Sequence, residues 1–256
     1  IILLYISNMS KKLKVIDLFA GAGGLSTGFE LSNYFKVIYA NEYIPKFCET
    51  YIKNHKDTIV ECKNIREVNL EDVNKLINKV KVDVIIGGAP CQGFSMAGRR
   101  DKKDPRNSLF MNFIKFVKFF EPKYFVMENV GGILTMKNSK NELVKDIILD
   151  EFRKIGYKVE YKKLLASDYG VPQNRRRVFF IGTKGNHEII FPEPTHDKTN
   201  RVAVKTILLD KKDVDKSYFH SQKMIDGFVR RKAANKAKGL GFGAQYLRLE
   251  EPSFTI

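Results

Sequence analysis

Short apolar runs and stretches with helical apolar spacing alternate along most of the chain. Runs typical of buried strands cover residues 14–19, 36–40, 82–86, 123–127, 157–165 and 176–182. Helical stretches lie between them at residues 25–31, 45–54, 70–80, 107–120 and 141–156, the last of which ends at Gly156. This alternation predicts an α/β fold, in which a mostly parallel sheet is covered by helices on both faces.

The pattern changes at the sequence FPEPTH, where Pro192 and Pro194 interrupt regular structure. Beyond this point the chain is polar, basic and weakly periodic. Met9 is followed by SKKLK, which is typical of an ordinary cytosolic start. We therefore expect an N-terminal extension at residues 1–13, a main domain at 14–192, and a linker with the beginning of a smaller region at 193–256.

The composition favours a folded, basic protein. Hydrophobic residues make up 43% of the chain, which is enough for a sizeable core, and the formal net charge is +16. Such an excess suits a polyanionic partner such as nucleic acid, although a general bias towards lysine gives the same count. The apolar opening IILLYI is too short to span a membrane.

The cysteines and histidines show no metal-binding or disulfide pattern. The chain has three cysteines, at 48, 62 and 91, and four histidines, at 55, 187, 196 and 220. No CxxC pair and no regular ligand spacing occurs among them. We expect an intracellular, reduced protein with no disulfide framework and no metal.

Two acidic or glycine-rich segments follow the first two predicted strands. The sequence DLFAGAGG, residues 17–24, places several glycines at a strand end, where the backbone can approach a ligand at a helix N-terminus. Glu42 ends the next strand, a position from which an acid commonly holds ribose hydroxyls. A simple tight turn and a solvated carboxylate are the competing interpretations.

The segment GGAPCQGFS, residues 87–95, places Cys91 in a loop directly after a strand. Ligands of open α/β sheets bind outside the carboxyl ends of the strands, so this position favours a displayed nucleophile over a buried structural thiol. Nearby cations would favour the reactive thiolate. They are Arg99, Arg100, Lys102, Lys103 and Arg106. A solvated basic loop beside an inert thiol is the alternative.

Two further segments add polar groups at strand ends. Glu128 and Asn129 follow the strand YFVM; Glu128 can hold a proton, and Asn129 can brace the cysteine loop. In VPQNRRRVFF, Gln173 precedes a strand, and alternation predicts that Arg175 and Arg177 share one of its faces. Their guanidinium groups suit a carbonyl oxygen or a phosphate, and a surface basic cluster is the alternative.

Taken in order, these segments resemble the motifs of the DNA (cytosine-5)-methyltransferases. DLFAGAGGLSTGF is similar to the cofactor motif of that family, and GGAPCQGFS to its nucleophile motif. The sequences ENV at 128–130 and QNRRR at 173–177 resemble its two cytosine-contacting motifs. The resemblance covers residues 14–183. It implies a Rossmann-like S-adenosylmethionine-dependent methyltransferase fold, with a catalytic domain at 14–192 and the start of a target-recognition region at 193–256.

The resemblance also implies a reaction on a cytosine flipped out of a specific double-stranded DNA sequence, as part of a restriction-modification system. Cys91 would add to carbon 6 of the ring, Glu128 would contact nitrogen 3 and the amine, and Arg177 would hold the carbonyl oxygen. Arg175 would support the cysteine loop or a phosphate, with Asn129 and Gln173 as further site residues. The loop with the five cations named above would contact DNA phosphates.

The cofactor implied by the resemblance is S-adenosylmethionine. Its expected contacts are Phe19, Gly21, Gly23, Gly24, Leu25, Glu42, Tyr43, Asn64, Ile65, Pro90 and Leu109. Glu42 would hold the ribose and Tyr43 would pack on the adenine. Asn64-Ile65 stands where the family has Asp-Ile, so the contact of Asn64 with adenine is a departure from the pattern.

Members of the family continue into two further C-terminal motifs, and the segment EEPSFTI resembles the stretch that precedes them. We therefore expect either a truncated product or one subunit of a split enzyme, with weak cofactor binding and little activity alone. A transfer-RNA cytosine methyltransferase and an inactive DNA-binding remnant are the alternatives. The expected location is the cytoplasm of a prokaryote, at the nucleoid, without membrane association.

Overall fold

The computed structural model describes residues 11–90, 109–138, 140–185, 187–240 and 245–255. The chain divides into two compact units. The first comprises Ile1–Leu164 and Arg176–Pro192, and the second comprises Leu165–Arg175 and Glu193–Ile256. The segment 165–175, which the sequence placed in the main domain, thus belongs to the second unit.

The first unit is built on a seven-stranded sheet with the order β3-β2-β1-β4-β5-β8-β6. Strands β1 to β5 run parallel to their neighbours, whereas β8 pairs antiparallel with β5. The bounds are β1 Leu13–Leu18, β2 Phe35–Glu42, β3 Ile59–Cys62, β4 Val84–Gly87, β5 Tyr124–Asn129, β6 Tyr157–Leu165 and β8 Arg176–Lys184. The prediction of a mostly parallel α/β sheet is confirmed.

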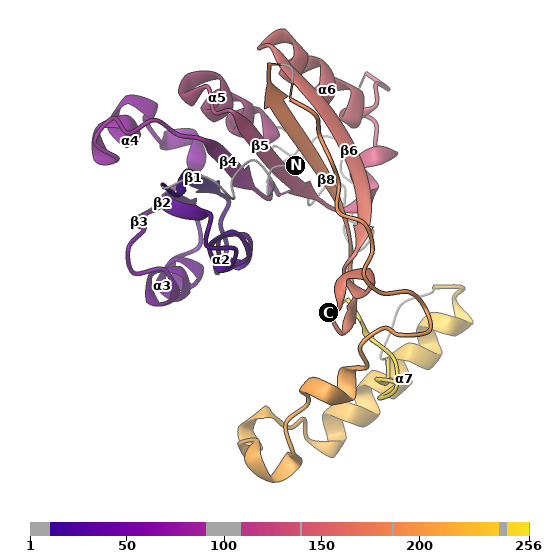
Figure 1. Ribbon diagram of the computed structural model, residues 1–256. Helices are drawn as coiled ribbons and strands as arrows, with labels where there is room; N and C mark the ends of the chain where they lie inside the picture. The colour runs from indigo at the N-terminus through magenta and orange to yellow at the C-terminus, as the bar shows by residue number, and fades with distance from the viewer. Residues whose placement is uncertain (1–10, 91–108, 139, 186, 241–244, 256) are drawn as a thin grey trace. The chain divides into compact units, whose positions relative to one another are not determined.

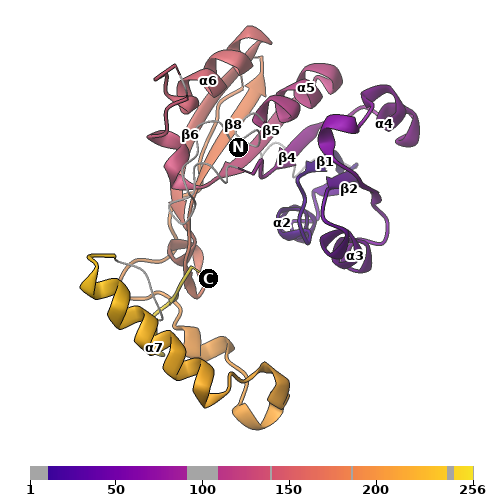
Figure 2. The ribbon, with the colours of Figure 1, turned by 180° about the vertical axis from the view of Figure 1, so that it is seen from behind.

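Helices cover both faces of this sheet (Figures 1 and 2). One face carries α2 (Gly24–Leu31) and α3 (Pro45–Asn54), and the other carries α4 (Leu70–Leu76), α5 (Phe110–Phe120) and α6 (Val144–Lys154). Alternation along β1 explains the two layers. Ile16 and Leu18 join the core under α4, α5 and α6, whereas Val15 packs in the cluster that includes Phe29 of α2.

The element boundaries follow local backbone signals. Helix α4 stops at Leu76, short of the predicted residue 80, because Asn78 and Lys79 adopt positive φ angles of 56° and 55°. Gly156 has a φ of 84° just after α6, as a helix stop requires. The edge strand β3 was not predicted, because its four residues are too few and too exposed to show an apolar pattern.

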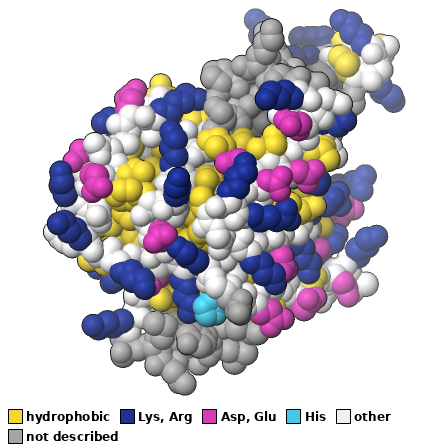
Figure 3. Space-filling model, turned by 90° about the horizontal axis from the view of Figure 1, so that it is seen from above, with side chains coloured by type: hydrophobic (Ala, Val, Ile, Leu, Met, Phe, Trp, Pro, Cys, Tyr) yellow, Lys and Arg dark blue, Asp and Glu magenta, His cyan; other side chains and the backbone are white. Residues whose placement is uncertain are grey.

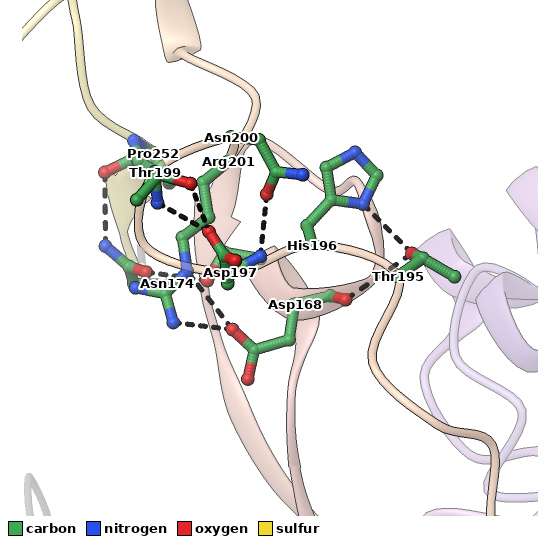
Figure 4. A network of polar contacts seen from close by, with 10 residues as sticks. Asp168, Asn174, Thr195, His196, Asp197, Thr199, Asn200, Arg201 and Pro252 are labelled. Atoms are coloured by element: carbon green, nitrogen blue, oxygen red, sulfur yellow. Dashed lines mark hydrogen bonds and ion pairs between the residues drawn. The ribbon is translucent and has the colours of Figure 1, made fainter.

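The second unit is held together by polar contacts as well as packing. It contains a short parallel pair, β7 (Gln173–Asn174) with β9 (Ser253–Phe254), and the helix α7 (Gln222–Ala237). Figure 4 shows how Asp168 joins separate segments of this unit: its carboxylate pairs with Arg201, and its backbone carbonyl accepts bonds from Thr195 and His196. This network fixes the chain just after the proline-containing linker.

Short 3₁₀ helices complete both units. They cover Ile65–Glu67, Gly131–Leu134, Ala166–Tyr169, Val204–Ile207, Lys211–Asp213 and Lys216–Tyr218. Within the described residues, no helix has the length and apolar character needed to cross a membrane.

Candidate active site

The carboxyl ends of four neighbouring parallel strands lie along one edge of the sheet. Leu18 at the end of β1 pairs with Asn41 of β2 and with Gly87 of β4, and Gly87 pairs in turn with Met127 of β5. The residues that follow these positions therefore emerge side by side, which is where open α/β sheets bind their ligands. Among the predicted site residues that the structure describes, Phe19 follows β1, Glu42 ends β2, and Glu128 lies at the end of β5.

A glycine turn forms the part of the edge after β1. Phe19 has a φ of 55°, an uncommon conformation for a bulky residue, and Gly23 has a φ of 94°. A Cβ atom on Gly23 would lie 2.3 Å from Nε2 of His55, so no larger residue fits there. A Cβ atom on Gly21 or Gly24 would instead meet open space. The turn therefore presents bare backbone outward, which suits close contact with a ligand.

Glu42 is fixed against this turn by three backbone amides. Its Oε2 accepts a hydrogen bond from the N–H of Gly21 at 2.8 Å, and its Oε1 accepts from Tyr43 and Ile44, each also at 2.8 Å. The side chain is held at 7% exposure. A carboxylate has about four acceptor sites, so it retains capacity for a ribose hydroxyl. This geometry fits the binding of a nucleoside cofactor.

The remaining predicted cofactor residues differ in their exposure to solvent. Ile65 is buried, while Tyr43 is 68% exposed. Asn64 caps the following 3₁₀ helix, since its side-chain oxygen accepts from the N–H of Arg66 at 3.1 Å. This cap uses the side-chain oxygen of Asn64 and not its amide N–H groups. Leu109 is buried, while Leu25 and Pro90 are partly exposed.

Glu128 and Arg177 form an ion pair on the same edge. Nε of Arg177, near the start of β8, lies 2.9 Å from Oε1 of Glu128, and both side chains are about one-fifth exposed. Arg177 also donates to the backbone carbonyl of Arg176 at 2.7 Å. A Cβ atom on Gly88 would lie 3.3 Å from Oε2 of Glu128. The glycine at position 88 therefore lets the β4 loop pass close to the Glu128 carboxylate.

Asn129 ties the end of β5 to the residue before Pro90. Its buried side-chain amide donates to the carbonyl oxygen of Ala89 at 3.0 Å, and its side-chain oxygen accepts from the N–H of Val130 at 2.9 Å. The base of the loop that leads to Cys91 is therefore anchored to the same strand that carries Glu128. Cys91 itself and the five predicted DNA-contacting cations at 99–106 lie outside the described residues.

Two predicted site residues, Gln173 and Arg175, belong to the second unit. Gln173 lies in β7, and Arg175 lies between β7 and β8. The expected alternation of Arg175 and Arg177 along one strand is wrong. Arg175 is held in a local turn, in which its N–H donates to Gln173 and its carbonyl oxygen accepts from Ala166, both at 2.9 Å.

The similarity to known proteins agrees with this geometry. The family model for the C-5 cytosine-specific DNA methylases matches residues 13–253. This chain belongs to that family. It is 50% identical over 184 residues to the type II methyltransferase M.DdeI of Desulfomicrobium norvegicum, covering 70% of this chain and 44% of that protein. It is 38% identical over 203 residues to M.AquIA of a Picosynechococcus strain, covering 75% and 80%.

A crystal structure supports the family assignment. An E. coli protein, described as a DNA modification methyltransferase encoded within a prophage, aligns with a TM-score of 0.59 and 35% identity. The alignment covers 68% of this methylase chain and 47% of the E. coli chain. The chain thus spans about half the length of several relatives that it matches, and four-fifths of M.AquIA.

Several features of this methylase chain were not predicted from its sequence. The expectation of no disulfide is wrong: Cys48 and Cys62 are joined, with Cα atoms 5.9 Å apart. The first turn of α3 packs beside the end of β3, which brings together two cysteines that are 14 positions apart. The Asp168–Arg201 pair was also missed, because neither residue stands in a recognisable motif.

Proposed function

We propose that this chain carries the reactive centre of a DNA (cytosine-5)-methyltransferase, EC 2.1.1.37, of a restriction-modification system. Its substrate would be a cytosine flipped out of a specific double-stranded DNA sequence. The observation that carries the proposal is the Glu128–Arg177 pair, which stands next to the anchored base of the Cys91 loop and on the same sheet edge as Glu42. Family membership supplies the reaction class.

S-adenosylmethionine fits the glycine turn and Glu42, and when bound it supplies an electrophilic methyl group. Gly21, Gly23 and Gly24 would carry the cofactor's polar portion on exposed backbone, and Glu42 would hold its ribose. The other contacts would come from Phe19, Leu25, Tyr43, Asn64, Ile65, Pro90 and Leu109. The amide N–H of Asn64 would donate to an adenine ring nitrogen.

In the proposed mechanism, the thiolate of Cys91 forms a bond to carbon 6 of the cytosine, which makes carbon 5 electron-rich. Arg177 would bind the cytosine carbonyl oxygen through its N–H groups, and Glu128 would hydrogen-bond nitrogen 3 and the amine. The ion pair orients both groups before the base arrives. After methylation, carbon 5 loses its proton to solvent water and the Cys91 sulfur leaves as a thiolate, which restores the ring.

Covalent trapping tests the chemistry directly. On a pool of random duplexes that contain 5-fluorocytosine, the chain should form an adduct that survives denaturation, in the presence of cofactor and of any partner polypeptide. Fluorine cannot leave as a proton does, so the sulfur bond should persist. Cys91→Ala should form no adduct, and Cys48→Ala, which keeps Cys91, is the matched control at saturating cofactor. Adduct formation by Cys91→Ala would exclude the assignment.

The partner is proposed to be double-stranded DNA in the cytoplasm of a prokaryote. Figure 3 shows Lys and Arg side chains spread over the face seen from above, with acidic ones among them. Helix α7 has no buried residue. Lys223 and Arg230 are seven positions apart and so share one side of it, with Gly227 between them. Small and cationic residues on one side suit close contact with phosphates.

The salt dependence of DNA binding tests the role of this side of α7. Replacing Lys223 and Arg230 by alanine should make the plot of log K against log salt less steep. The magnitude of its negative slope should fall by about two, since each lost phosphate contact removes about 0.9. The matched control replaces Lys232 and Lys236 by alanine. This change removes the same amount of charge from the opposite side of the same helix. Equal slopes for both double variants would contradict a specific contact. Competing transfer RNA in the methylation assay tests the RNA alternative.

The family's C-terminal motifs, on the same or on a second polypeptide, are proposed to complete the cofactor pocket. Exposed apolar side chains beside Glu42 support this: Tyr43 is 68%, Ile44 42% and Phe47 44% exposed. With these motifs supplied, methyl transfer should rise sharply over that of residues 1–256 alone. Turnover by residues 1–256 alone at the level of a full-length enzyme would contradict the need for these motifs.

A further inference from the structure

The disulfide between Cys48 and Cys62 connects a buried position to an exposed one. Cys48 lies in α3 and is 3% exposed, whereas Cys62 is the exposed last residue of β3. The Cα separation of 5.9 Å lies within the usual range for disulfides. Cys62 is therefore the cysteine that a small-molecule reagent can approach from solvent, while Cys48 is buried in the fold.

Both cysteines adjoin the backbone of Glu42. In the parallel pairing of β2 and β3, Cys62 is the register partner of Glu42. The sulfur of Cys48 lies 3.6 Å from the carbonyl oxygen of Glu42, and the same oxygen accepts a hydrogen bond from Lys63 at 2.9 Å. Asn64 follows Cys62 by two residues. The cross-link therefore fastens the segment that holds both Glu42 and Asn64.

We propose that Cys48 and Cys62 form a thiol–disulfide exchange site that is oxidised by low-molecular-weight disulfides and that sets the affinity of the chain for its cofactor. The inference rests on the proposed function, because it takes Glu42 as the ribose ligand. In the oxidised form, the disulfide fixes α3 and β3 next to Glu42, so the segment loses less conformational entropy when the cofactor binds. In the reduced form, this segment must be ordered by the cofactor itself.

The exchange proceeds in two balanced steps. The thiolate of Cys62 attacks a disulfide RSSR, forming a mixed disulfide at Cys62 and releasing one thiolate RS⁻. The thiolate of Cys48 then attacks the Cys62 sulfur, forming the protein disulfide and releasing the second RS⁻. The two cysteine protons end on the two RSH molecules. The protein thiols lose two electrons and the reagent gains them.

The coupling between disulfide formation and cofactor binding must be reciprocal. If oxidation tightens cofactor binding by a given factor, the cofactor raises the ratio of disulfide to dithiol by the same factor. We expect a factor of about five or more, in the range typical of coupled sites. This consequence can be measured without any methyl transfer, and a disulfide that is merely structural would not show it.

The experiment measures the redox state of the full chain in glutathione buffers with and without S-adenosylmethionine. After alkylation, mass spectrometry distinguishes the reduced chain, with three labelled cysteines, from the oxidised chain, in which only Cys91 is labelled. Saturating cofactor should shift the disulfide-to-dithiol ratio at least about five-fold. Glu42→Gln should abolish the shift. Glu61→Gln, one residue before Cys62, is the matched control and should retain it.

The outcomes separate this inference from the proposed function. Equilibrium dialysis with labelled cofactor runs in parallel on the oxidised and reduced chains. An unchanged redox ratio in a sample that binds the cofactor overturns the exchange site and leaves the methyltransferase proposal standing. Failure of Cys48 and Cys62 to form a disulfide in any buffer also overturns it. Absence of cofactor binding at millimolar concentration in both redox states contradicts the cofactor site itself.

Discussion

The buried carboxyl group of Asp17 should make the stability of this chain depend on pH. Asp17 lies in β1 with no exposed surface, and its Oδ2 accepts a hydrogen bond from the hydroxyl of Ser26 at 2.7 Å. That hydroxyl lies 2.6 Å from the hydroxyl of Tyr51 and, since it gives its proton to Asp17, accepts from Tyr51. Among the described residues, Oδ1 of Asp17 has no partner.

Burial raises the pKa of Asp17 from 3.8 to about 7, and the hydrogen bond from Ser26 opposes this rise. The negative charge of Glu42 adds a smaller upward shift to the pKa. Because the folded-state value is the higher one, the folded chain holds the proton that the unfolded chain has lost. The stabilisation by protonated Asp17 is therefore complete below about pH 4 and is lost as the pH rises to 7.

The magnitude follows from the size of the shift. About three pKa units at 1.4 kcal/mol each give roughly 4 kcal/mol between pH 4 and 8. In Asp17→Asn, the neutral amide has nearly the shape of the carboxylic acid and does not titrate. The free energy of unfolding of the natural chain, minus that of the variant, should fall by about 1.4 kcal/mol per pH unit between pH 5 and 7.

Urea unfolding of both chains at pH 5, 6, 7 and 8 measures this difference. All other titrating groups are common to the two proteins, so their contributions cancel to first order. The difference should level off above pH 7. A difference that stays constant from pH 5 to 8 would show that Asp17 is ionised at low pH in the folded chain, and would refute the argument from burial.

Four other substitutions test packing, anchoring and cross-linking. Gly182→Ala should lower the free energy of unfolding by about 3 kcal/mol, because the new Cβ would lie 1.9 Å from the Phe125 ring. Gly28→Ala, whose Cβ meets open space within α2, should raise it by about 0.5 kcal/mol. Chemical denaturation measures both changes. Asn129→Ala should slow trapping of 5-fluorocytosine at least about ten-fold without weakening cofactor binding, since only the cysteine loop loses its anchor; equal trapping rates would argue against this role. Cys48→Ser should lower the stability of the oxidised chain by about 3 kcal/mol and leave the reduced chain nearly unchanged; a similar loss under reducing conditions would point to packing instead.

The sequence was sufficient to predict those parts of the fold that depend on local patterns. Strand β6 and helix α3 have the predicted bounds, because each has clear ends and a regular apolar pattern. Helix α7 was missed because it buries no residue, so its apolar positions have no reason to follow a helical period. The antiparallel direction of β8 was also not visible, since apolar alternation is the same for either direction of a strand.

The candidate site was predictable where it depends on strand ends, and was not where it depends on contacts between distant segments. Glu42 and Glu128 each end a parallel strand, and parallel strands bring their ends to one edge regardless of the details of packing. The Cys48–Cys62 link instead depends on how α3 packs against β3, which no spacing in the sequence reveals.

Arg175 illustrates the same limit within a single motif. The run of three arginines at 175–177 predicts a single strand. In the structure, however, the chain passes from one compact unit to the other between Arg175 and Arg176. Only Arg177 pairs with Glu128 within the described sheet. Because Arg177 extends from a strand of the sheet itself, its position relative to Glu128 is set by the β5–β8 register. Arg175 instead takes its position from the turn that it forms with Gln173 and Ala166. The two arginines should therefore respond differently to changes in the second unit: destabilising that unit should disturb Arg175 while leaving the Glu128–Arg177 pair intact.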